Sequence, residues 1–219
     1  QAVLDALEEA AADQNIVELA NATADLSALV NALIEADLVS TLEGEGPFTV
    51  FAPTNDAFAT FLSVNGYTSL DDIPNEVLVQ LLLNHVVAGE VASTDLSTGY
   101  ISSLSTAGPD ASNLSLYINT EGGVAINGVS NVSTADVSAS NGIVHIVDAV
   151  IDIPTVVTFA TAAPTFAPLV TALTDGPTAT DFPTVLSGDG PFTVFAPTDA
   201  AFQALLDSNP DWDTVTDID

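Results

Sequence analysis

Apolar residues recur at helical spacing along the first part of the chain. Residues 2–12 (AVLDALEEAAA) are mostly strong helix formers, and between Asn15 and Val39 the apolar side chains return every three or four positions. A further helix is expected to start near Pro74, because proline is favoured in a first turn, and to run through NEVLVQLLLNH. Its inward face is predicted to carry Val77, Leu78, Leu81 and Leu82.

The pattern changes after these helices. Segments rich in β-branched residues alternate with turns of Gly, Asn and Ser at 115–118, 123–126, 129–137 and 142–151. Such short segments between turn residues are typical of strands. The pattern therefore predicts an α+β unit, with helices first and an antiparallel sheet afterwards.

One stretch occurs twice. GEGPFTVFAPTNDAF at 44–58 returns as GDGPFTVFAPTDAAF at 188–202, and most of the positions are identical. Duplication of a whole folding unit explains this match. In each copy PFTVFA predicts a short buried strand, the following Pro-Thr ends it, and a helix follows with the threonine as N-cap and an aspartate bonding its first amides. The residues with these roles are Phe48, Val50, Phe51, Pro53, Thr54 and Asp56 in the first copy and Phe192, Val194, Phe195, Pro197, Thr198 and Asp199 in the second.

The repeat divides the chain into parts. Residues 1–13 form an N-terminal helical segment or inter-repeat linker, 14–153 one complete domain, and 154–219 the first half of a second. Because the second copy has no counterpart of 75–153, we expect it to expose apolar surface and an unpaired strand edge. Two explanations stay open: the sequence is a portion of a longer tandem chain, or another molecule completes the fold.

These motifs resemble a known family. FTVFAPTNDAF at 48–58 and GIVHIVDAVI at 142–151 are similar to the two conserved boxes of the fasciclin (FAS1) domain, and LLLNHVVAGEV at 81–91 is similar to its central segment. In that segment His85 is kept, whereas Asn84 replaces the family's usual tyrosine. The resemblance implies a β-wedge or sandwich with packed helices, usually extracellular and in tandem, with roles in adhesion and matrix organisation. In animal members the Tyr-His neighbourhood is linked to integrin-dependent adhesion, so the exchange to Asn84 argues against assigning integrin binding here.

The charge balance is extreme. The chain has no Lys or Arg and 30 Asp and Glu, for a net charge of -30, while 47% of its residues are hydrophobic and can supply a core. A chain without basic side chains cannot neutralise phosphates, so nucleic acid is excluded as a partner. Self-repulsion predicts that stability rises with salt, divalent cations or mild acid. The absence of cysteine leaves neither disulfides nor thiolate metal sites.

Residues 153–174 carry no charge and are long enough for a membrane span. Pro154, Pro164 and Pro168 interrupt this segment, and no flanking Lys or Arg sets a topology. We therefore expect no membrane span.

Reactive groups are few. The histidines, His85 and His145, lie in the apolar runs NHVV and GIVHIV, which favours hydrogen-bonded core or sheet residues over catalysis. Asp207, Asn209, Asp211 and Asp213 imitate the start of an EF-hand loop, but Trp212 stands where glycine is needed and Ile218 where the bidentate glutamate is needed, which favours a solvated turn. The sequence predicts no catalytic, cofactor-binding or metal-binding residue, and the one ion expected on its surface is weakly bound Ca²⁺.

Three N-x-Ser/Thr triplets are candidate glycosylation sites, at Asn21, Asn113 and Asn131. Asn113, in a polar loop, is the first choice.

The sequence as a whole favours a secreted or cell-surface protein without catalysis. It is expected to act in adhesion, in a matrix or in a filament, with other protein subunits (a homo-oligomer or filament), glycans or matrix components as partners. One alternative is an acidic, calcium-binding surface coat protein. Another is a carbohydrate-active enzyme that uses carboxylates.

Overall fold

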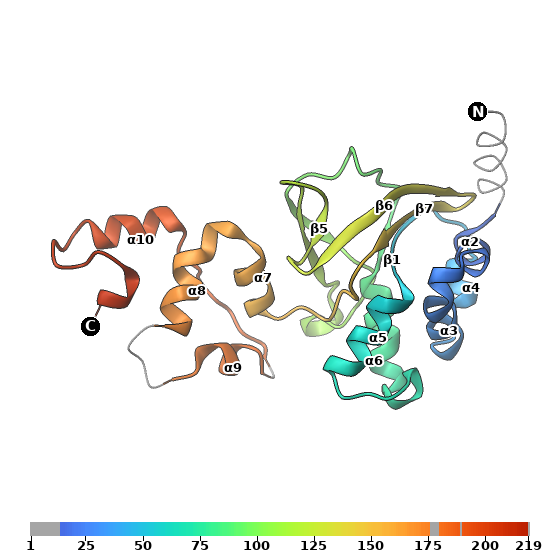
Figure 1. Ribbon diagram of the computed structural model, residues 1–219, viewed down its shortest axis with the longest axis horizontal. Helices are drawn as coiled ribbons and strands as arrows, with labels where there is room; N and C mark the ends of the chain where they lie inside the picture. Colours follow the sequence, from blue (N-terminus) through green and yellow to red (C-terminus); the bar gives the residue numbers. More distant parts are fainter. Residues whose placement is uncertain (1–13, 176–179, 189, 219) are drawn as a thin grey trace. The chain divides into compact units, whose positions relative to one another are not determined.

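The computed structural model describes residues 14–175, 180–188 and 190–218, and the chain divides between Ile153 and Pro154 into two compact units (Figure 1). We describe each unit by itself. The helix expected within residues 1–13 lies outside the described residues.

Unit 1 begins with helices, as the apolar spacing predicts. They are gathered on one side of a sheet (Figure 1). The α-helices are α2 (Ile16–Ala22), α3 (Ser27–Glu35), α4 (Val39–Leu42), α5 (Asn55–Val64) and α6 (Asn75–Asn84), with 3-10 turns η1 (Ala24–Leu26), η2 (Leu70–Asp72) and η3 (Pro109–Ala111).

The inward face of α6 differs from the prediction at one residue. Leu78, Leu81 and Leu82 are buried, but Val77 is 45% exposed. At 3.6 residues per turn the three leucines form one stripe, and Val77 falls at its margin.

Seven strands form the sheet of unit 1, in the order β2-β1-β7-β6-β5-β4-β3. Their bounds are β1 (Phe48–Pro53), β2 (Val86–Ala88), β3 (Gly99–Ser102), β4 (Ser115–Asn119), β5 (Ala125–Ile126), β6 (Ser130–Ala139) and β7 (Gly142–Val147). The expectation of an antiparallel sheet is wrong at one place, because β1 and β7 run parallel from Phe48 opposite Gly142 to Pro53 opposite Val147. A tight turn forces antiparallel pairing only on strands that it joins, and no such turn joins β1 to β7.

Strand β1 is covered on both faces. Val50 and Ala52 pack with the helices in one core cluster, whereas Phe51 packs in a second cluster with residues such as Leu116 and Ile118. Successive side chains of a strand point to opposite faces, so this central strand joins the two cores. Its mostly apolar sequence, in which Thr49 is the one hydroxyl residue, follows from this position.

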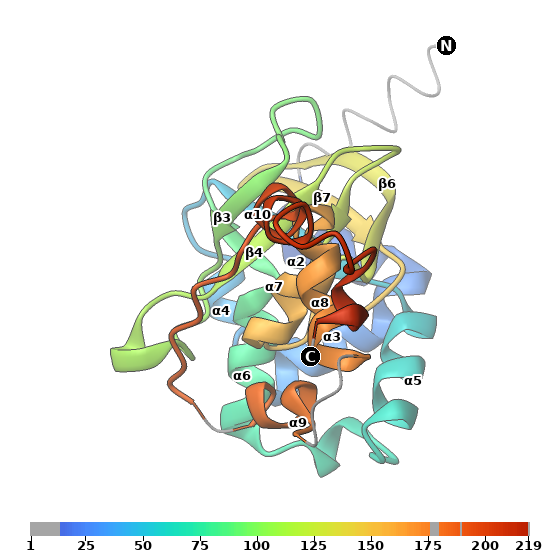
Figure 2. The ribbon, with the colours of Figure 1, turned by 90° about the vertical axis from the view of Figure 1, so that its left-hand side faces the viewer.

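Unit 2 repeats the helical start of unit 1. It contains α7 (Val156–Ala162), η4 (Pro164–Phe166), α8 (Ala167–Thr174), α9 (Phe182–Leu186), α10 (Asp199–Leu206) and η5 (Val215–Asp217). The second FTVFAP, at 192–197, is not a strand, and in Figure 2 it runs as a coil that leads into α10. The prediction of buried core strand residues at Phe192, Val194 and Phe195 is therefore wrong for this unit, because the described residues supply no neighbouring strand.

No single helix among the described residues is both long and apolar enough to cross a bilayer. Two helix pairs, 16–35 and 156–174, meet the length and composition test when taken together, and each is bent by more than 100° at its break.

Candidate functional site

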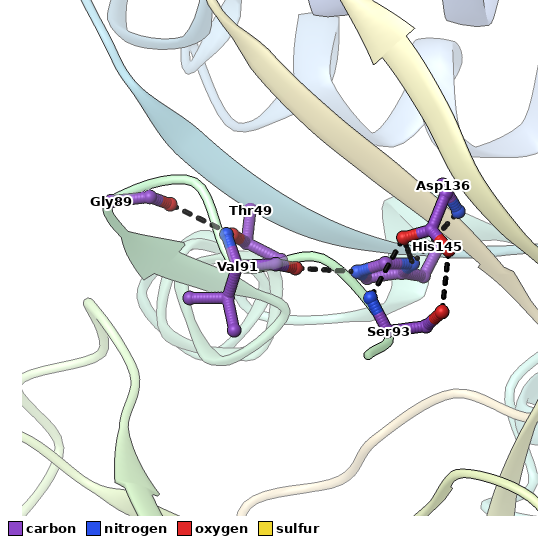
Figure 3. Close-up of polar contacts among 6 residues, drawn as sticks. All are labelled: Thr49, Gly89, Val91, Ser93, Asp136 and His145. Atoms are coloured by element: carbon purple, nitrogen blue, oxygen red, sulfur yellow. Dashed lines mark hydrogen bonds and ion pairs between the residues drawn. The ribbon is translucent and has the colours of Figure 1, made fainter. Parts of the chain in front are cut away.

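The main polar network of unit 1 surrounds His145 on β7 (Figure 3). His145 is fully buried and pairs with Phe51 on the neighbouring strand β1, and the two ring centroids lie 5.6 Å apart. An imidazole in this position needs hydrogen-bond partners inside the protein, because water does not reach it.

Both ring nitrogens of His145 form hydrogen bonds with backbone groups. The amide of Asp136 donates to Nδ1 over 3.2 Å, so Nδ1 carries no hydrogen, and Nε2 donates to the carbonyl oxygen of Val91 over 3.0 Å. This pattern selects the neutral Nε2–H tautomer. Neither nitrogen is left to accept a proton from a substrate.

Asp136 stands beside this ring at a bulge of β6. Its φ of +60° lies in the left-handed region, and the register of β6 with β7 shifts between Thr134 and Val137. Its carboxylate accepts hydrogen bonds from the hydroxyl of Ser93 and, over 2.7 Å, from the amide of Ser93. These two bonds hold the pKa of Asp136 below its ordinary value, against the smaller opposing effect of burial.

Thr49 on β1 forms hydrogen bonds with residues 89–93, the loop that contains Val91 and Ser93 (Figure 3). Its hydroxyl donates to the carbonyl of Gly89 over 2.7 Å and accepts from the amide of Val91 over 2.9 Å. Together with His145 and Asp136, it binds residues 89–93, which follow β2, to strands β1, β6 and β7.

A Ser, His and Asp therefore lie together, but not as a nucleophilic triad. In such a triad the histidine bonds the serine hydroxyl and the aspartate orients the histidine. Here Ser93 donates to Asp136, and both nitrogens of His145 bond backbone groups. The arrangement holds a loop in place.

His85, the C-cap residue of α6, is the centre of a second buried hydrogen-bond network. Its Nδ1 donates to the carbonyl of Leu81 over 2.8 Å, and its Nε2 accepts from the amide of Ile151 over 2.8 Å. Burial lowers the pKa of His85 to about 4, against the smaller opposing effect of the Leu81 bond. His85 is thus the Nδ1–H tautomer, the opposite of His145.

Asn84, at the position where the resemblance to the fasciclin domain implies a tyrosine, forms hydrogen bonds next to those of His85. Its side-chain amide donates to the carbonyls of Ile151 and Asp152 over 3.2 and 3.0 Å, and its oxygen accepts from the hydroxyl of Ser103 over 3.0 Å. Asn84 and His85 together attach the last residues of unit 1 to α6.

The two copies of the repeated motif differ in their surroundings. Phe51 and Val50 are 0% and 2% exposed, whereas Phe195 and Val194 are 94% and 42% exposed. After Pro53, the hydroxyl of Thr54 accepts the amide of Ala57 over 3.2 Å and caps α5. After Pro197, Thr198 has the N-cap position of α10 but makes no such bond.

The proposed amide bonds of Asp56 and Asp199 are not found among the described residues. Thr54 already occupies the N-cap and takes the amide that Asp56 would need. Both aspartates lie in the first turns of their helices, where a negative charge interacts favourably with the helix dipole and stabilises the helix.

The acidic residues of the described ranges form no metal-binding cluster. Within the ranges that the structure describes, no group of three or more His, Cys, Asp or Glu could hold a metal ion. In the stretch that imitates an EF-hand, Asp207 accepts from the side chain of Gln203, and Asn209 accepts from the amide of Asp211. Asp213 donates its amide to Asp217.

The three sequons are exposed, but their side chains differ. The amide nitrogen of Asn113 donates to the carbonyl of Ser103 over 2.7 Å, and that of Asn131 donates to Asp148 over 3.0 Å. Asn21 lies on α2. Glycosylation at any of them stays a prediction.

Sequence reasoning missed several polar residues that the fold brings together. Thr49, Ser93 and Asp136 come from three distant segments, and no short motif joins them. Asn141 is another: its amide donates to the carbonyls of Leu42 and Gly44, and its oxygen accepts the amide of Ile16. The Asn-Gly pair at 141–142 is a recognisable turn signal between two strands, but its contacts with the N-terminal helices are not visible in sequence.

Comparisons with known proteins identify one domain family and several relatives. The family model for the fasciclin domain matches residues 24–154 and 165–215. Protein sll1483 of Synechocystis sp. is 40% identical over 136 residues, which cover 62% of this chain and 72% of that protein. Transforming growth factor-beta-induced protein ig-h3 of Sus scrofa is 32% identical over 166 residues, or 75% of this chain but 23% of the relative.

A solved structure has the same fold. It is a FAS1 domain pair from the insect cell adhesion molecule fasciclin I, with a TM-score of 0.55 and 20% identity. The match covers 85% of this chain and 64% of that one.

Proposed function

The chain belongs to the fasciclin domain family, and from that premise we propose that it is a secreted or cell-surface protein that acts through adhesion. Its units bind other protein subunits, in an oligomer or filament, together with glycans or matrix components. Repeated units raise avidity without a strong single site.

The observation that carries this proposal is that both histidines have a structural role. The ring nitrogens of His85 and His145 bond backbone groups, so both side chains serve the scaffold. A general base needs a nitrogen within reach of the proton that it abstracts. What this molecule offers to partners is therefore its surface, and the matched FAS1 pair likewise comes from a cell adhesion molecule.

Bead clustering tests the adhesive function. Beads coated with the chain are mixed with each other, with collagen-coated beads and with beads coated with a neutral glucan. We expect clustering in at least one mixture, and its reversal by excess soluble chain. Beads coated with an equally acidic protein of another fold are the control, since charge alone would act equally in both.

Two results would contradict the proposal. One is the absence of clustering in all three mixtures. The other is steady turnover of chromogenic glycosides or esters by the purified chain, which would make it an enzyme.

A second candidate function rests on the net charge of -30. We propose that such a surface also binds Ca²⁺ weakly, as an acidic coat would, because a cation relieves the self-repulsion of the folded chain. Thermal melting across millimolar Ca²⁺ tests this function, with Na⁺ at equal ionic strength as the control. An equal melting temperature in both salts would exclude it.

A further inference from the structure

Three Asn-Gly pairs occur in unit 1, at 65–66, 127–128 and 141–142. A glycine after asparagine leaves its own backbone nitrogen open to approach, because it has no Cβ. In such a pair this nitrogen can attack the side-chain carbonyl carbon of the asparagine and form a cyclic imide. The fold decides whether this happens, since the bond forms only when the two atoms reach a near-attack geometry.

The fold holds every polar atom of the Asn141 side chain. Its nitrogen donates to the carbonyls of Leu42 and Gly44 over 2.7 and 3.0 Å, and its oxygen accepts from the amide of Ile16 over 3.0 Å. The next residue, Gly142, begins β7 and is buried. Turning the side chain of Asn141 toward the nitrogen of Gly142 would break these contacts, so this pair is protected.

Asn127 is also held. It is 2% exposed, and its backbone amide donates to the carbonyl of Tyr117 over 2.8 Å. Its side-chain oxygen accepts from the amide of Tyr117, again over 2.8 Å. Reaction at this pair therefore requires the end of β5 to separate from β4.

Asn65 differs from both. It is the C-cap residue of α5, and both Asn65 and Gly66 are exposed. Within the described ranges its side chain makes one hydrogen bond, from its nitrogen to the carbonyl of Phe61 over 2.9 Å. The amide of Gly66 donates to the carbonyl of Ser63 over a long 3.3 Å. A helix end that is exposed to water opens at a low free energy, so the two reacting groups can meet here without unfolding of the sheet.

We propose that Asn65 is a site of spontaneous covalent modification, at which the intact chain ages into a mixture of aspartate and isoaspartate forms. The backbone nitrogen of Gly66 bonds to Cγ of Asn65 and loses its proton, and the side-chain nitrogen leaves as ammonia. Water then opens the imide at one of its two carbonyls. Opening at one carbonyl gives aspartate, and opening at the other gives isoaspartate. Water is the one co-reactant, and the oxidation state of no atom changes.

Both products alter the end of α5. The new carboxylate places a negative charge at the C-terminus of a helix, where the helix dipole is also negative. Isoaspartate in addition lengthens the backbone after residue 65, so the amide of Tyr67 cannot keep its 2.9 Å bond to the carbonyl of Leu62. Tyr67 packs against the helical core of unit 1. The modification therefore loosens the turn that follows α5.

Timed incubation of the intact chain at mildly alkaline pH is the experiment. Samples are cleaved with chymotrypsin, since the chain has no Lys or Arg for trypsin. Fragmentation mass spectrometry then locates each asparagine that has become an acid. Isoaspartate is measured separately through its methylation by protein-isoaspartate methyltransferase. We expect Asn65 to react at least about tenfold faster than Asn127 or Asn141, because these two are held away from the attacking nitrogen.

Denaturant supplies the first control. In guanidinium chloride at the same pH the three pairs lose their different surroundings, and they should react at similar rates. Each of the three is followed by an apolar or aromatic residue after the glycine, so their local sequences are alike. The difference expected in the native chain is then an effect of the fold.

Three variants sharpen the test. Gly66→Ala should slow the reaction at Asn65 by at least about tenfold, because a Cβ now hinders the attacking nitrogen. Gly128→Ala is the matched control: its φ of +71° is close to the +74° of Gly66, so the backbone strain is similar, but Asn65 should react as before. Asn65→Gln keeps a side-chain amide but would have to form a larger ring, and should abolish the change at this position.

Other outcomes overturn the proposal. They are no reaction at Asn65 in the native chain, equal rates at the three pairs in the native chain, or an unchanged rate in Gly66→Ala. The same order of rates in guanidinium chloride as in the native chain would show that the fold does not select the site, which also overturns it. None of these results bears on the adhesion of the beads, so the two proposals fail separately.

Discussion

The ring of His85 accepts a hydrogen bond from the amide of Ile151 over 2.8 Å, across 66 positions of sequence. This bond links the end of α6 to the last residues of unit 1. It exists only while Nε2 is unprotonated, so it couples the stability of unit 1 to pH.

Acid should weaken unit 1 through His85. Its pKa is about 4 in the folded chain, against 6.5 ordinarily, so the unfolded chain takes up the proton first as pH falls. The contribution of His85 to the free energy of unfolding is therefore fully present above pH 6.5. It is lost progressively between pH 6.5 and pH 4, and the loss is about 3 kcal/mol at 1.36 kcal/mol per pH unit. Urea unfolding between pH 7 and pH 4 measures it.

The variant His85→Gln is the control, because its side chain does not titrate. Self-repulsion of the acidic chain predicts the opposite trend, with stability rising in mild acid. The variant should show that rise, or at least a flatter profile than the parent chain. Parallel profiles for the two proteins would show that His85 is not the cause.

Asp136 should stabilise unit 1 through its charge. Asp136→Asn removes the charge but suits the left-handed φ of +60°. Because the carboxylate is partly exposed, we expect a loss of about 1 kcal/mol in the free energy of unfolding. Asp136→Ala should cost more, since alanine also strains this backbone. Denaturant unfolding compares the two, and an equal loss for both would contradict the role of the conformation.

Gly142 should tolerate no side chain. In Gly142→Ala the new Cβ would lie 2.0 Å from the carbonyl oxygen of Phe48, so β1 and β7 could not keep their pairing. We expect a loss of more than about 3 kcal/mol or failure to fold. Gly66→Ala is the matched control: its φ is +74° but no atom lies within 4 Å of the new Cβ. It should cost only about 1 kcal/mol, and equal losses would count against the steric argument.

The two threonines of the repeated motif should differ in importance. Thr54 caps α5 through the amide of Ala57, whereas Thr198 makes no side-chain cap bond. Thr54→Ala should cost about 1 kcal/mol and Thr198→Ala much less. Helical circular dichroism during thermal unfolding measures both, and a larger loss from Thr198→Ala would contradict this reading.

Local patterns in the sequence were sufficient for much of unit 1. Apolar spacing identified the helices around 16–35 and 75–84, and β-branched segments identified β4, β6 and β7. Strand β3 was missed because GYIS carries little pattern of its own. The parallel pairing of β1 with β7 was missed because it joins segments about ninety positions apart, beyond the reach of any local rule.

The candidate site was predicted only in part. His85 and His145 could be selected because histidines in apolar runs are unusual. Their partners could not, since the amide of Ile151 and the amide of Asp136 reach them through the folding of the sheet. Which ring nitrogen carries the proton follows from those partners, and so does the pKa of His85.

By itself the sequence determined the duplication, the helices that open each unit and the Pro-Thr that leads into α5 and α10, because each depends on neighbouring residues. Only the tertiary structure decided the state of FTVFAP, which is a buried strand at 48–53 and an exposed coil at 192–197. The residues are the same in both places. A strand satisfies its backbone through neighbouring strands, so its conformation depends on what lies beside it.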